Sequence, residues 1–213
     1  MKQKRAVIIA GGSMSGYSYI KQLISPEDTI IAADSGYLHA KKLGLIPDIV
    51  LGDFDSLGFV PQDVPIIEVP AKKDLTDTEL ALHFARDKGI KDFLFLAAFG
   101  TRMDHTLANI FLLAQLLEYD ESGQIIDEHN RVWITNAHLR IDVDTDAYLS
   151  LIPITNCFGV TTENLAYPLS GAKLEVGKGL GISNLATKNP VQIRLTEGTL
   201  LVVQSSDSAK NSE

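Results

Sequence analysis

Short apolar runs alternate with amphipathic stretches along the first half of the chain. Most of the apolar runs are continuous, which is typical of strands that are buried on both faces of a parallel sheet. The predicted strands are "RAVIIA", "TIIAAD", "DIVLGD", "PIIEVP" and "DFLFLAA". The predicted helices are "SYIKQLI", "YLHAKKLG", "TDTELALHFARDKG" and "DHTLANIFLLAQLLEYD". This alternation predicts a doubly wound α/β domain with a mainly parallel sheet.

The last two predicted helices carry apolar residues at helical spacing, and this spacing predicts the face that each helix buries. In the third helix the predicted face consists of Leu80, Ala81, Phe84 and Ala85. In the fourth helix it consists of Leu107, Ile110, Phe111, Ala114 and Leu117.

After "YDESGQ" the pattern changes to short β-prone runs that are separated by Asn, Asp and Gly turns. These runs are "IIDEHNRVWIT", "HLRIDVDTDAYLSLIPI", "AKLEVGKGLGIS" and "VQIRLTEGTLLVV". Because helical periodicity is absent, they predict an antiparallel sandwich or barrel-like domain, of which we expect the β-sandwich. We therefore expect an α/β domain over residues 1–122, a β-sandwich domain over 123–205 and a polar, disordered tail over 206–213.

Composition narrows the class of protein. The 213 residues are enough to bury a substantial core, and 45% hydrophobic with 22% charged residues is typical of a globular protein. The formal net charge of −8 argues against nucleic acid or an anionic membrane as the main partner, because both attract clustered Lys and Arg. No apolar stretch approaches the roughly 20 residues of a membrane span. The single cysteine, Cys157, is expected to be a core residue, which fits a reducing cytoplasm.

Acidic residues and glycines follow the predicted strands directly. Asp34 follows "TIIAA", Asp53 and Asp55 follow "DIVLG", and Gly11 and Gly12 follow "AVIIA". Ligands of open parallel sheets bind beyond the carboxyl ends of the strands, so these residues predict a site at one sheet edge. Three carboxylates in a crevice require a neutralising cation, and Mg²⁺ would also allow an acidic protein to bind a phosphate-containing ligand. The alternative for "GDFDS" by itself is a surface turn.

A second acidic stretch, "KKDLTDTE", precedes the third predicted helix. Thr76 and Glu79 have the spacing of a capping box, and Asp77 is favourable at a helix N-terminus. Capping leaves Asp74 unexplained, and it does not require so many acidic residues in one loop. These residues are therefore candidates for the same site.

A third stretch, "FGTRMDHTLAN", lies between the last predicted strand of the α/β domain and its last helix. Asp104 is placed to cap that helix. Arg102 lies just outside the helix N-terminus, where its guanidinium suits a phosphate oxygen. His105 and Asn109 are four residues apart and therefore share one face of the helix near this end.

Together these motifs resemble those of the thiamine pyrophosphokinase family, which carries an Asp after its second strand, then G-D-x-D-S, K-D-x-T-D and G-x-R-x-D-H-x-x-A-N. This chain has Asp34, "GDFDS", "KDLTD" and "GTRMDHTLAN" in the same order. Each motif is weak by itself, but the combination is specific.

The resemblance continues into the β-rich half, where the family tends to carry an aromatic residue, a Leu and a Ser-Asn pair. These look like Tyr167, Leu169, Ser183 and Asn184 in this chain. The chain departs from the family pattern at Phe99, Thr101 and Leu185, where the family tends to have a small or hydroxyl residue, a glycine and an acidic residue, respectively.

The resemblance implies transfer of a diphosphoryl group from ATP to the hydroxyl of thiamine, which gives thiamine diphosphate and AMP. It implies that Mg²⁺ is held by Asp53, Asp55 and Asp77, and that Lys73 and Arg102 take further negative charge. The implied catalytic residues are Asp53, Asp55, Asp74 and Asp77. The implied nucleotide-binding residues are Gly12, Asp34, Ser35, Lys73, Thr76, Arg102, Asp104 and His105.

Thiamine joins a cationic thiazolium ring to an aminopyrimidine, so it suits an aromatic face and amide or hydroxyl partners. The implied thiamine-binding residues are Asn109, Tyr167, Ser183 and Asn184. Any of the carboxylates is a candidate for the general base, and His105 is a less favoured one.

The family resemblance also implies a homodimer in which the β domain of one subunit completes the site on the α/β domain of the other.

Two other function classes fit an Asp-x-Asp pair after a parallel strand. One is a metal-dependent nucleotide-sugar transferase, and the other is a nucleotide sensor without catalysis. The first would turn over a sugar nucleotide and ignore thiamine, and the second would bind ATP without releasing AMP.

Overall fold

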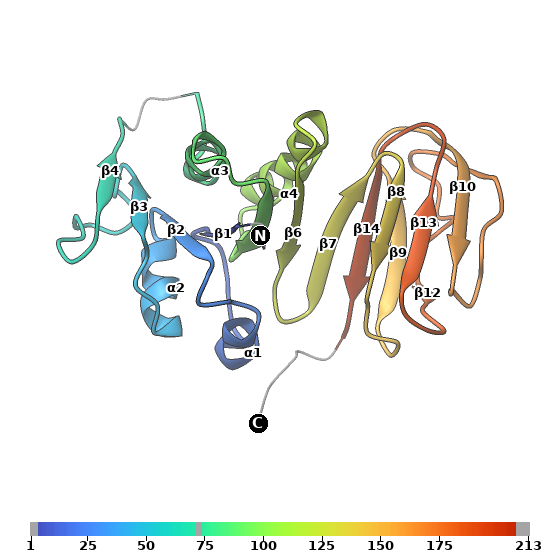
Figure 1. The fold of residues 1–213 in the computed structure, drawn as a ribbon, viewed down its shortest axis with the longest axis horizontal. Helices are drawn as coiled ribbons and strands as arrows, with labels where there is room; N and C mark the ends of the chain where they lie inside the picture. The colour runs from blue at the N-terminus through green and yellow to red at the C-terminus, as the bar shows by residue number, and fades with distance from the viewer. Residues whose placement is uncertain (1–3, 71–73, 208–213) are drawn as a thin grey trace. The chain divides into compact units, whose positions relative to one another are not determined.

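The computed structural model describes residues 4–70 and 74–207, which divide into two compact units after Glu128. The first unit contains six parallel strands in the order β6-β5-β1-β2-β3-β4 (Figure 1). Their bounds are β1 Arg5–Ile9, β2 Thr29–Ala33, β3 Ile49–Gly52, β4 Ile66–Glu68, β5 Asp92–Leu96 and β6 Ser122–Ile126. The doubly wound parallel domain predicted from the sequence is confirmed.

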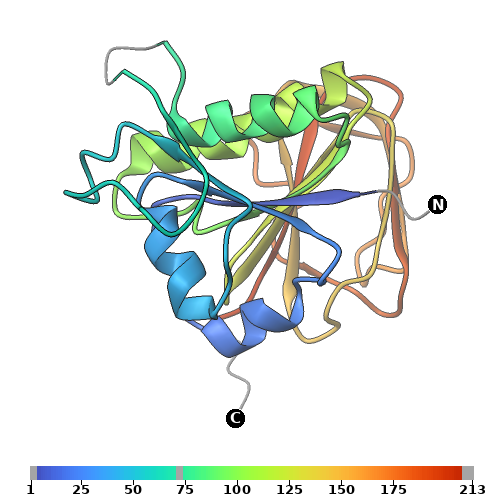
Figure 2. The ribbon, with the colours of Figure 1, turned by 60° about the vertical axis from the view of Figure 1, so that its left-hand side comes forward.

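Four helices cover the two faces of this sheet. They are α1 Tyr17–Gln22, α2 Gly36–Leu43, α3 Asp77–Asp87 and α4 Met103–Glu118. Figure 2 shows α1 and α2 on one face, with α3 and α4 on the other. The central strands β1, β2, β3 and β5 are almost fully buried, and side chains such as Ile8, Ile9, Leu94 and Phe95 are inaccessible to solvent. Their continuous apolar character follows from this burial on both faces.

The chain order of the strands creates a switch point between β1 and β5. The chain builds outward from β1 through β2, β3 and β4, and β5 then pairs with the opposite side of β1. The connections that leave β1 and β5 therefore diverge to opposite faces, which opens a crevice at the carboxyl ends of these two strands.

One prediction about α4 is wrong. The residues that it buries are Asn109, Leu112, Leu113 and Leu116, whereas the predicted-face residues Leu107 and Phe111 are 45% and 50% exposed. Apolar residues occur on almost every side of this helix, so their spacing does not select a single face. In α3 the prediction is partly right, because Ala81 and Ala85 are buried, but together with Thr78 and Leu82 rather than with Leu80 and Phe84.

The second unit consists of two antiparallel sheets, with strand orders β12-β9-β14-β7 and β11-β10-β13-β8. The strands are β7 Asn130–Thr135, β8 His138–Ile141, β9 Tyr148–Pro153, β10 Cys157–Glu163, β11 Ala172–Leu174, β12 Asn184–Leu185, β13 Val191–Arg194 and β14 Leu200–Ser205. One hydrophobic core takes side chains from both sheets, including Leu151, Val202, Val160 and Ile193. This is the predicted sandwich, although the sequence pattern did not identify β10.

The junction between the units differs from the expected boundary near residue 122. Strand β6 pairs in parallel with β5 and continues the first sheet as far as Ile126. At the other end of the second unit, the backbone of Ser206 still pairs with His129 at 3.0 Å, and the rest of the predicted tail lies outside the described residues from 208 onward. No helix in the described ranges is long and apolar enough to cross a membrane.

Candidate active site

A pocket of about 520 Å³ lies at the switch point of the parallel sheet. Its walls are the segments that follow β1, β2, β3 and β5, together with the first turns of α3 and α4. It is lined by Ala10, Gly11, Gly12, Ser13, Ala33, Asp34, Ser35, Asp53, Ser56, Leu75, Thr76, Asp77, Thr78, Ala98, Phe99, Gly100, Thr101, Arg102, His105, Thr106 and Asn109. The sequence-predicted residues therefore converge on one pocket, with exceptions described below.

The glycine-rich loop after β1 is bonded to the turn that follows β5. The backbone N–H of Gly12 donates to the carbonyl of Ala97 at 2.8 Å, and that of Ser13 donates to the carbonyl of Phe99 at 2.6 Å. A Cβ atom at position 12 would overlap these carbonyl oxygens, so only glycine permits this close approach. The two loops form one continuous wall of the pocket.

Polar side chains of α4 brace the same wall from within the domain. Asn109 is buried, and its Nδ2 donates to the carbonyl of Ala98 at 2.8 Å. The hydroxyl of Thr106 accepts from the N–H of Gly100 at 3.1 Å. Asn109 was predicted to bind thiamine, and the structure gives it this bracing contact while also placing it on the pocket surface.

Three helices begin at the pocket. The N-cap residues of α2, α3 and α4 are Ser35, Thr76 and Arg102, and all three line it. The Thr76 hydroxyl accepts from the N–H of Glu79 at 3.2 Å, as the capping-box prediction requires. Because a helix N-terminus carries partial positive charge and unpaired N–H groups, three of them at one pocket favour an anionic ligand.

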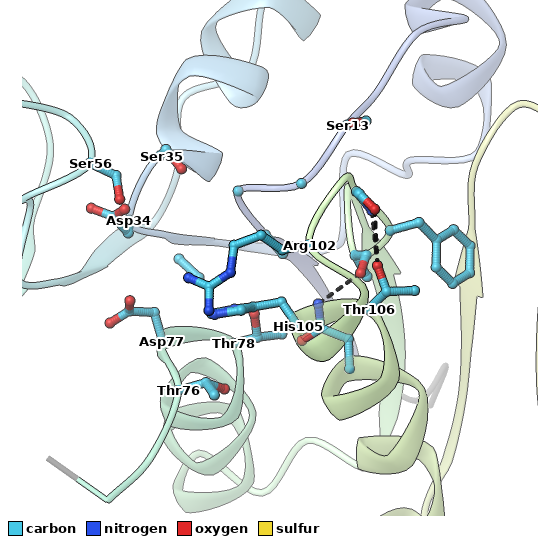
Figure 3. Close-up of a pocket in the computed structure, with 18 of the residues that line it drawn as sticks. Ser13, Asp34, Ser35, Ser56, Thr76, Asp77, Thr78, Arg102, His105 and Thr106 are labelled. Atoms are coloured by element: carbon cyan, nitrogen blue, oxygen red, sulfur yellow. Dashed lines mark hydrogen bonds between the residues drawn. The ribbon is translucent and has the colours of Figure 1, made fainter.

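Carboxylates line the same pocket. Asp34 is 7% exposed, and its Oδ1 atom is buried without a hydrogen-bond partner among the described residues. Asp53 and Asp77 also line the pocket, and in Figure 3 the Arg102 side chain extends toward the side where Asp34, Ser56 and Asp77 lie. A buried carboxylate oxygen without a partner is unfavourable, so these oxygen donors fit a hard divalent cation.

Three predicted acidic residues, Asp55, Asp74 and Asp104, do not line the pocket. Asp55 is exposed, and its N–H donates to Asp53 Oδ1 at 3.1 Å, as in a turn. Asp74 is also exposed. Within residues 4–70 and 74–207, no group of three or more His, Cys, Asp or Glu side chains is close enough to hold a metal ion. Lys73 lies outside the described residues.

Arg102 and Asp104 form an exposed ion pair at the start of α4. Arg102 Nη2 lies 2.6 Å from Asp104 Oδ2. The hydrogen bond from Arg102, with a further one from the backbone of His105, lowers the pKa of Asp104 to about 2. The prediction that Asp104 caps the helix is wrong, because Arg102 occupies the N-cap position and Asp104 lies in the first turn. A carboxylate of such low basicity is a weak general base.

The predicted thiamine-binding residues of the β-sandwich are held together by Asn184. Its side chain is buried, with Oδ1 accepting from the N–H of Tyr167 at 3.0 Å and Nδ2 donating to the carbonyl of Tyr167 at 2.7 Å. These two bonds fix the backbone at Tyr167, a residue that is 71% exposed. Ser183 has a φ of 57°, and its N–H donates to the Ser150 hydroxyl at 3.1 Å.

Several pocket residues were not nominated from the sequence. They are mainly small or hydroxyl residues: Ser13, Ser56, Thr78 and Thr106. Ser56, Thr78 and Thr106 lie inside sequence stretches that were recognised as candidate parts of the site, so their position in the sequence could have identified them. Thr78 is buried on α3.

Comparison with known proteins gives two family matches. Residues 20–126 match the model of the thiamin pyrophosphokinase catalytic domain, and residues 137–200 match that of the thiamin pyrophosphokinase vitamin B1 binding domain. A protein from Bacillus subtilis (strain 168) named thiamine pyrophosphokinase is 28% identical over 210 residues, which cover 94% of this chain and 98% of the relative.

Solved structures agree with this relationship. A crystal structure of thiamine pyrophosphokinase from Bacillus subtilis has a TM-score of 0.84 at 24% identity and covers 97% of this chain and 100% of its own, which shows the shared fold. A thiamin pyrophosphokinase structure from Geobacillus thermodenitrificans has a TM-score of 0.81 at 26% identity, and the match covers 97% of this chain and 99% of that structure's chain. Because the two family models together match well over half of its residues, the chain belongs to the thiamin pyrophosphokinase family.

Proposed function

We propose that the protein transfers the diphosphoryl group of ATP to thiamine and releases thiamine diphosphate and AMP, as its family membership indicates. The observation that carries the proposal is one pocket that combines three helix N-termini, a glycine-rich loop, Arg102 and acidic residues. The helix N-termini and Arg102 suit the phosphates of ATP, and the carboxylates suit the cation that accompanies them.

Each part of the pocket has a role in this proposal. The Gly11–Ser13 loop shapes the wall beside the phosphates, because its N–H groups at Gly12 and Ser13 are already bonded to Ala97 and Phe99. The N-cap residues Ser35 and Thr76 bind phosphate oxygens, and Arg102 binds them through its guanidinium. A divalent cation, held by Asp53 and Asp77, would neutralise the charge of the phosphates. Asp34 lines the same pocket, and Asp55 lies two residues after Asp53. We assign Mg²⁺ to this position because oxygen donors and phosphate are its usual partners.

The reaction requires one bond to form and one to break. The thiamine hydroxyl oxygen attacks the β-phosphorus of ATP, and the bond from this phosphorus to the oxygen shared with the α-phosphate breaks, so AMP leaves. The hydroxyl proton passes to a carboxylate that lines the pocket. Asp104 is not such an acceptor, because it does not line the pocket, its pKa is about 2 and Arg102 already binds it.

We expect ATP, Mg²⁺ and thiamine incubated with the protein to give AMP and thiamine diphosphate in equal amounts, measured by chromatography. ADP or phosphate as the nucleotide product, with thiamine unchanged, would contradict the proposal. Binding of ATP without AMP release would support the sensor alternative. Turnover of a sugar nucleotide in place of thiamine would support the nucleotide-sugar transferase.

The second part of the proposal is a homodimer with shared sites. Both units expose apolar side chains in the single chain: Met103, Leu107 and Phe111 on α4 of the first, and Tyr148, Tyr167 and Leu180 in the second. Such surfaces favour association between copies, and a two-fold dimer is the commonest assembly. Each site would take its phosphate-binding residues from one subunit and Tyr167 from the other.

Subunit mixing tests this arrangement. An Asp53→Asn subunit is mixed with a Tyr167→Ala subunit under conditions that allow exchange, and activity is measured at low thiamine concentration. With shared sites, one site of each hybrid is built from unmutated residues, so about a quarter of wild-type activity returns after random exchange. If mass measurement confirms hybrids and no activity returns, the sites lie within single chains.

A further inference from the structure

Two residues outside the pocket form a chain of contacts to the glycine-rich loop from α1 and α2. Tyr17 opens α1, His39 lies on α2, and the Tyr17 hydroxyl is 2.8 Å from His39 Nδ1. The other ring nitrogen, Nε2, lies 2.9 Å from the carbonyl oxygen of Gly12. The imidazole thus connects the hydroxyl of Tyr17 to the backbone of the loop.

The partners determine which nitrogen of His39 carries the proton. A carbonyl oxygen only accepts hydrogen bonds, so Nε2 carries a hydrogen and donates it to Gly12. In the neutral ring Nδ1 then accepts from the Tyr17 hydroxyl. Burial of the ring lowers the pKa of His39, and the nearby positive charge of Lys42 acts in the same direction, so the neutral form is favoured near pH 7. Lys42 itself lies 5.7 Å from the centre of the Tyr17 ring.

The hydrogen bond from His39 to Gly12 helps to fix the backbone of the glycine-rich loop. On one side, the N–H groups of Gly12 and Ser13 are bonded to the turn after β5. On the other side, the Gly12 carbonyl is bonded to His39. The peptide plane between Gly12 and Ser13 is therefore held at both its oxygen and its nitrogen, and this plane lines the pocket.

We infer that His39 and Tyr17 are positioning residues that hold the glycine-rich loop in the geometry that accommodates the phosphates of ATP. This inference rests on the proposed function, because it assumes that the pocket takes ATP. Neither residue touches the pocket, so their effect on ATP passes through the backbone of Gly12.

Replacement of His39 by Gln and by Asn separates the contact from general packing. The Gln amide nitrogen extends about as far as Nε2 and can donate to Gly12, whereas the Asn amide is shorter and reaches only the position of Nδ1. We expect His39→Asn to raise the KM for ATP roughly tenfold, the usual effect of one lost hydrogen bond. The KM for ATP should stay within about twofold of wild type in His39→Gln and rise about threefold in Tyr17→Phe. The KM for thiamine should not change in any of these variants.

Hydrogen exchange gives a readout that does not depend on activity. Without ATP, the amides of Gly12 and Ser13 should exchange faster in His39→Asn than in wild type or His39→Gln, measured by mass spectrometry or NMR. His138→Asn, at an exposed position on β8, is the matched control and should change neither exchange nor KM.

Equal ATP KM values and equal loop exchange in all these variants would overturn the inference while leaving ATP-dependent turnover of the wild type intact. If the wild type does not use ATP, the proposed function fails. The comparison of amide exchange at Gly12 and Ser13 between His39→Asn and wild type still shows whether His39 holds the loop. If His39→Asn does not fold, Tyr17→Phe removes a single hydroxyl and provides the same comparison against His39→Gln.

Discussion

Asp53→Asn is expected to lower kcat by about a hundredfold to a thousandfold, the range observed when one preorganised electrostatic group is removed. Asp53 lines the pocket, and its negative charge is what a cation bound with the phosphates requires. Asparagine retains a side-chain oxygen, so the hydrogen bond from the N–H of Asp55 and the turn around it persist. Steady-state kinetics at saturating Mg²⁺, with circular dichroism to verify the fold, measure the effect.

The matched control for this variant is Asp87→Asn. Asp87 is exposed at the end of α3 and is outside the pocket, so its neutralisation should leave kcat unchanged. A near-normal rate for Asp53→Asn would mean that "GDFDS" is a surface turn without a catalytic role. A large decrease in kcat for Asp87→Asn as well would indicate a general effect of net charge.

Arg102→Ala is expected to raise the KM for ATP by about ten- to a hundredfold, because a charged hydrogen bond to phosphate is lost. The side chain is exposed and lines the pocket, so the substitution creates no cavity and the melting temperature should hardly change. Arg102→Lys keeps the charge without the planar pair of donors and should have an intermediate KM. Kinetics with ATP varied at saturating thiamine separate the three proteins.

Arg140→Ala, at an exposed position on β8, serves as the control for loss of a surface arginine and should bind ATP normally. An unchanged KM in Arg102→Ala would mean that the ion pair with Asp104 holds this guanidinium away from the nucleotide in the active protein as well. Phosphate binding would then depend on the helix N-termini and the glycine-rich loop, without Arg102.

The sequence predicted the elements of the first unit well because their signals are local. Continuous apolar runs such as "DFLFLAA" reflect burial on both faces, and every predicted strand and helix of this unit is present. The prediction failed for the buried face of α4. Its apolar residues surround most of the helix, so only contact with the neighbouring strands determines that Leu113 is buried and Phe111 is exposed.

The site was partly predictable for a related reason. Residues directly after parallel strands lie at one sheet edge, so Gly12, Asp34 and Asp53 could be placed together. The sequence could not distinguish Asp53, which lines the pocket, from Asp55, which is exposed. The difference depends on the turn in which Asp53 accepts a hydrogen bond from the N–H of Asp55.

By itself, the sequence determined the order of strands and helices, the change from an α/β to a β-rich unit, and the motifs of the family. These features depend on residue spacing and on chemistry within short segments. Only the tertiary structure decided which strands are neighbours, that β5 pairs with β1, and that three helix N-termini meet at one pocket. It also revealed the contact from His39 to Gly12, because such a contact depends on how α2 packs against the sheet and leaves no periodic signal in the chain.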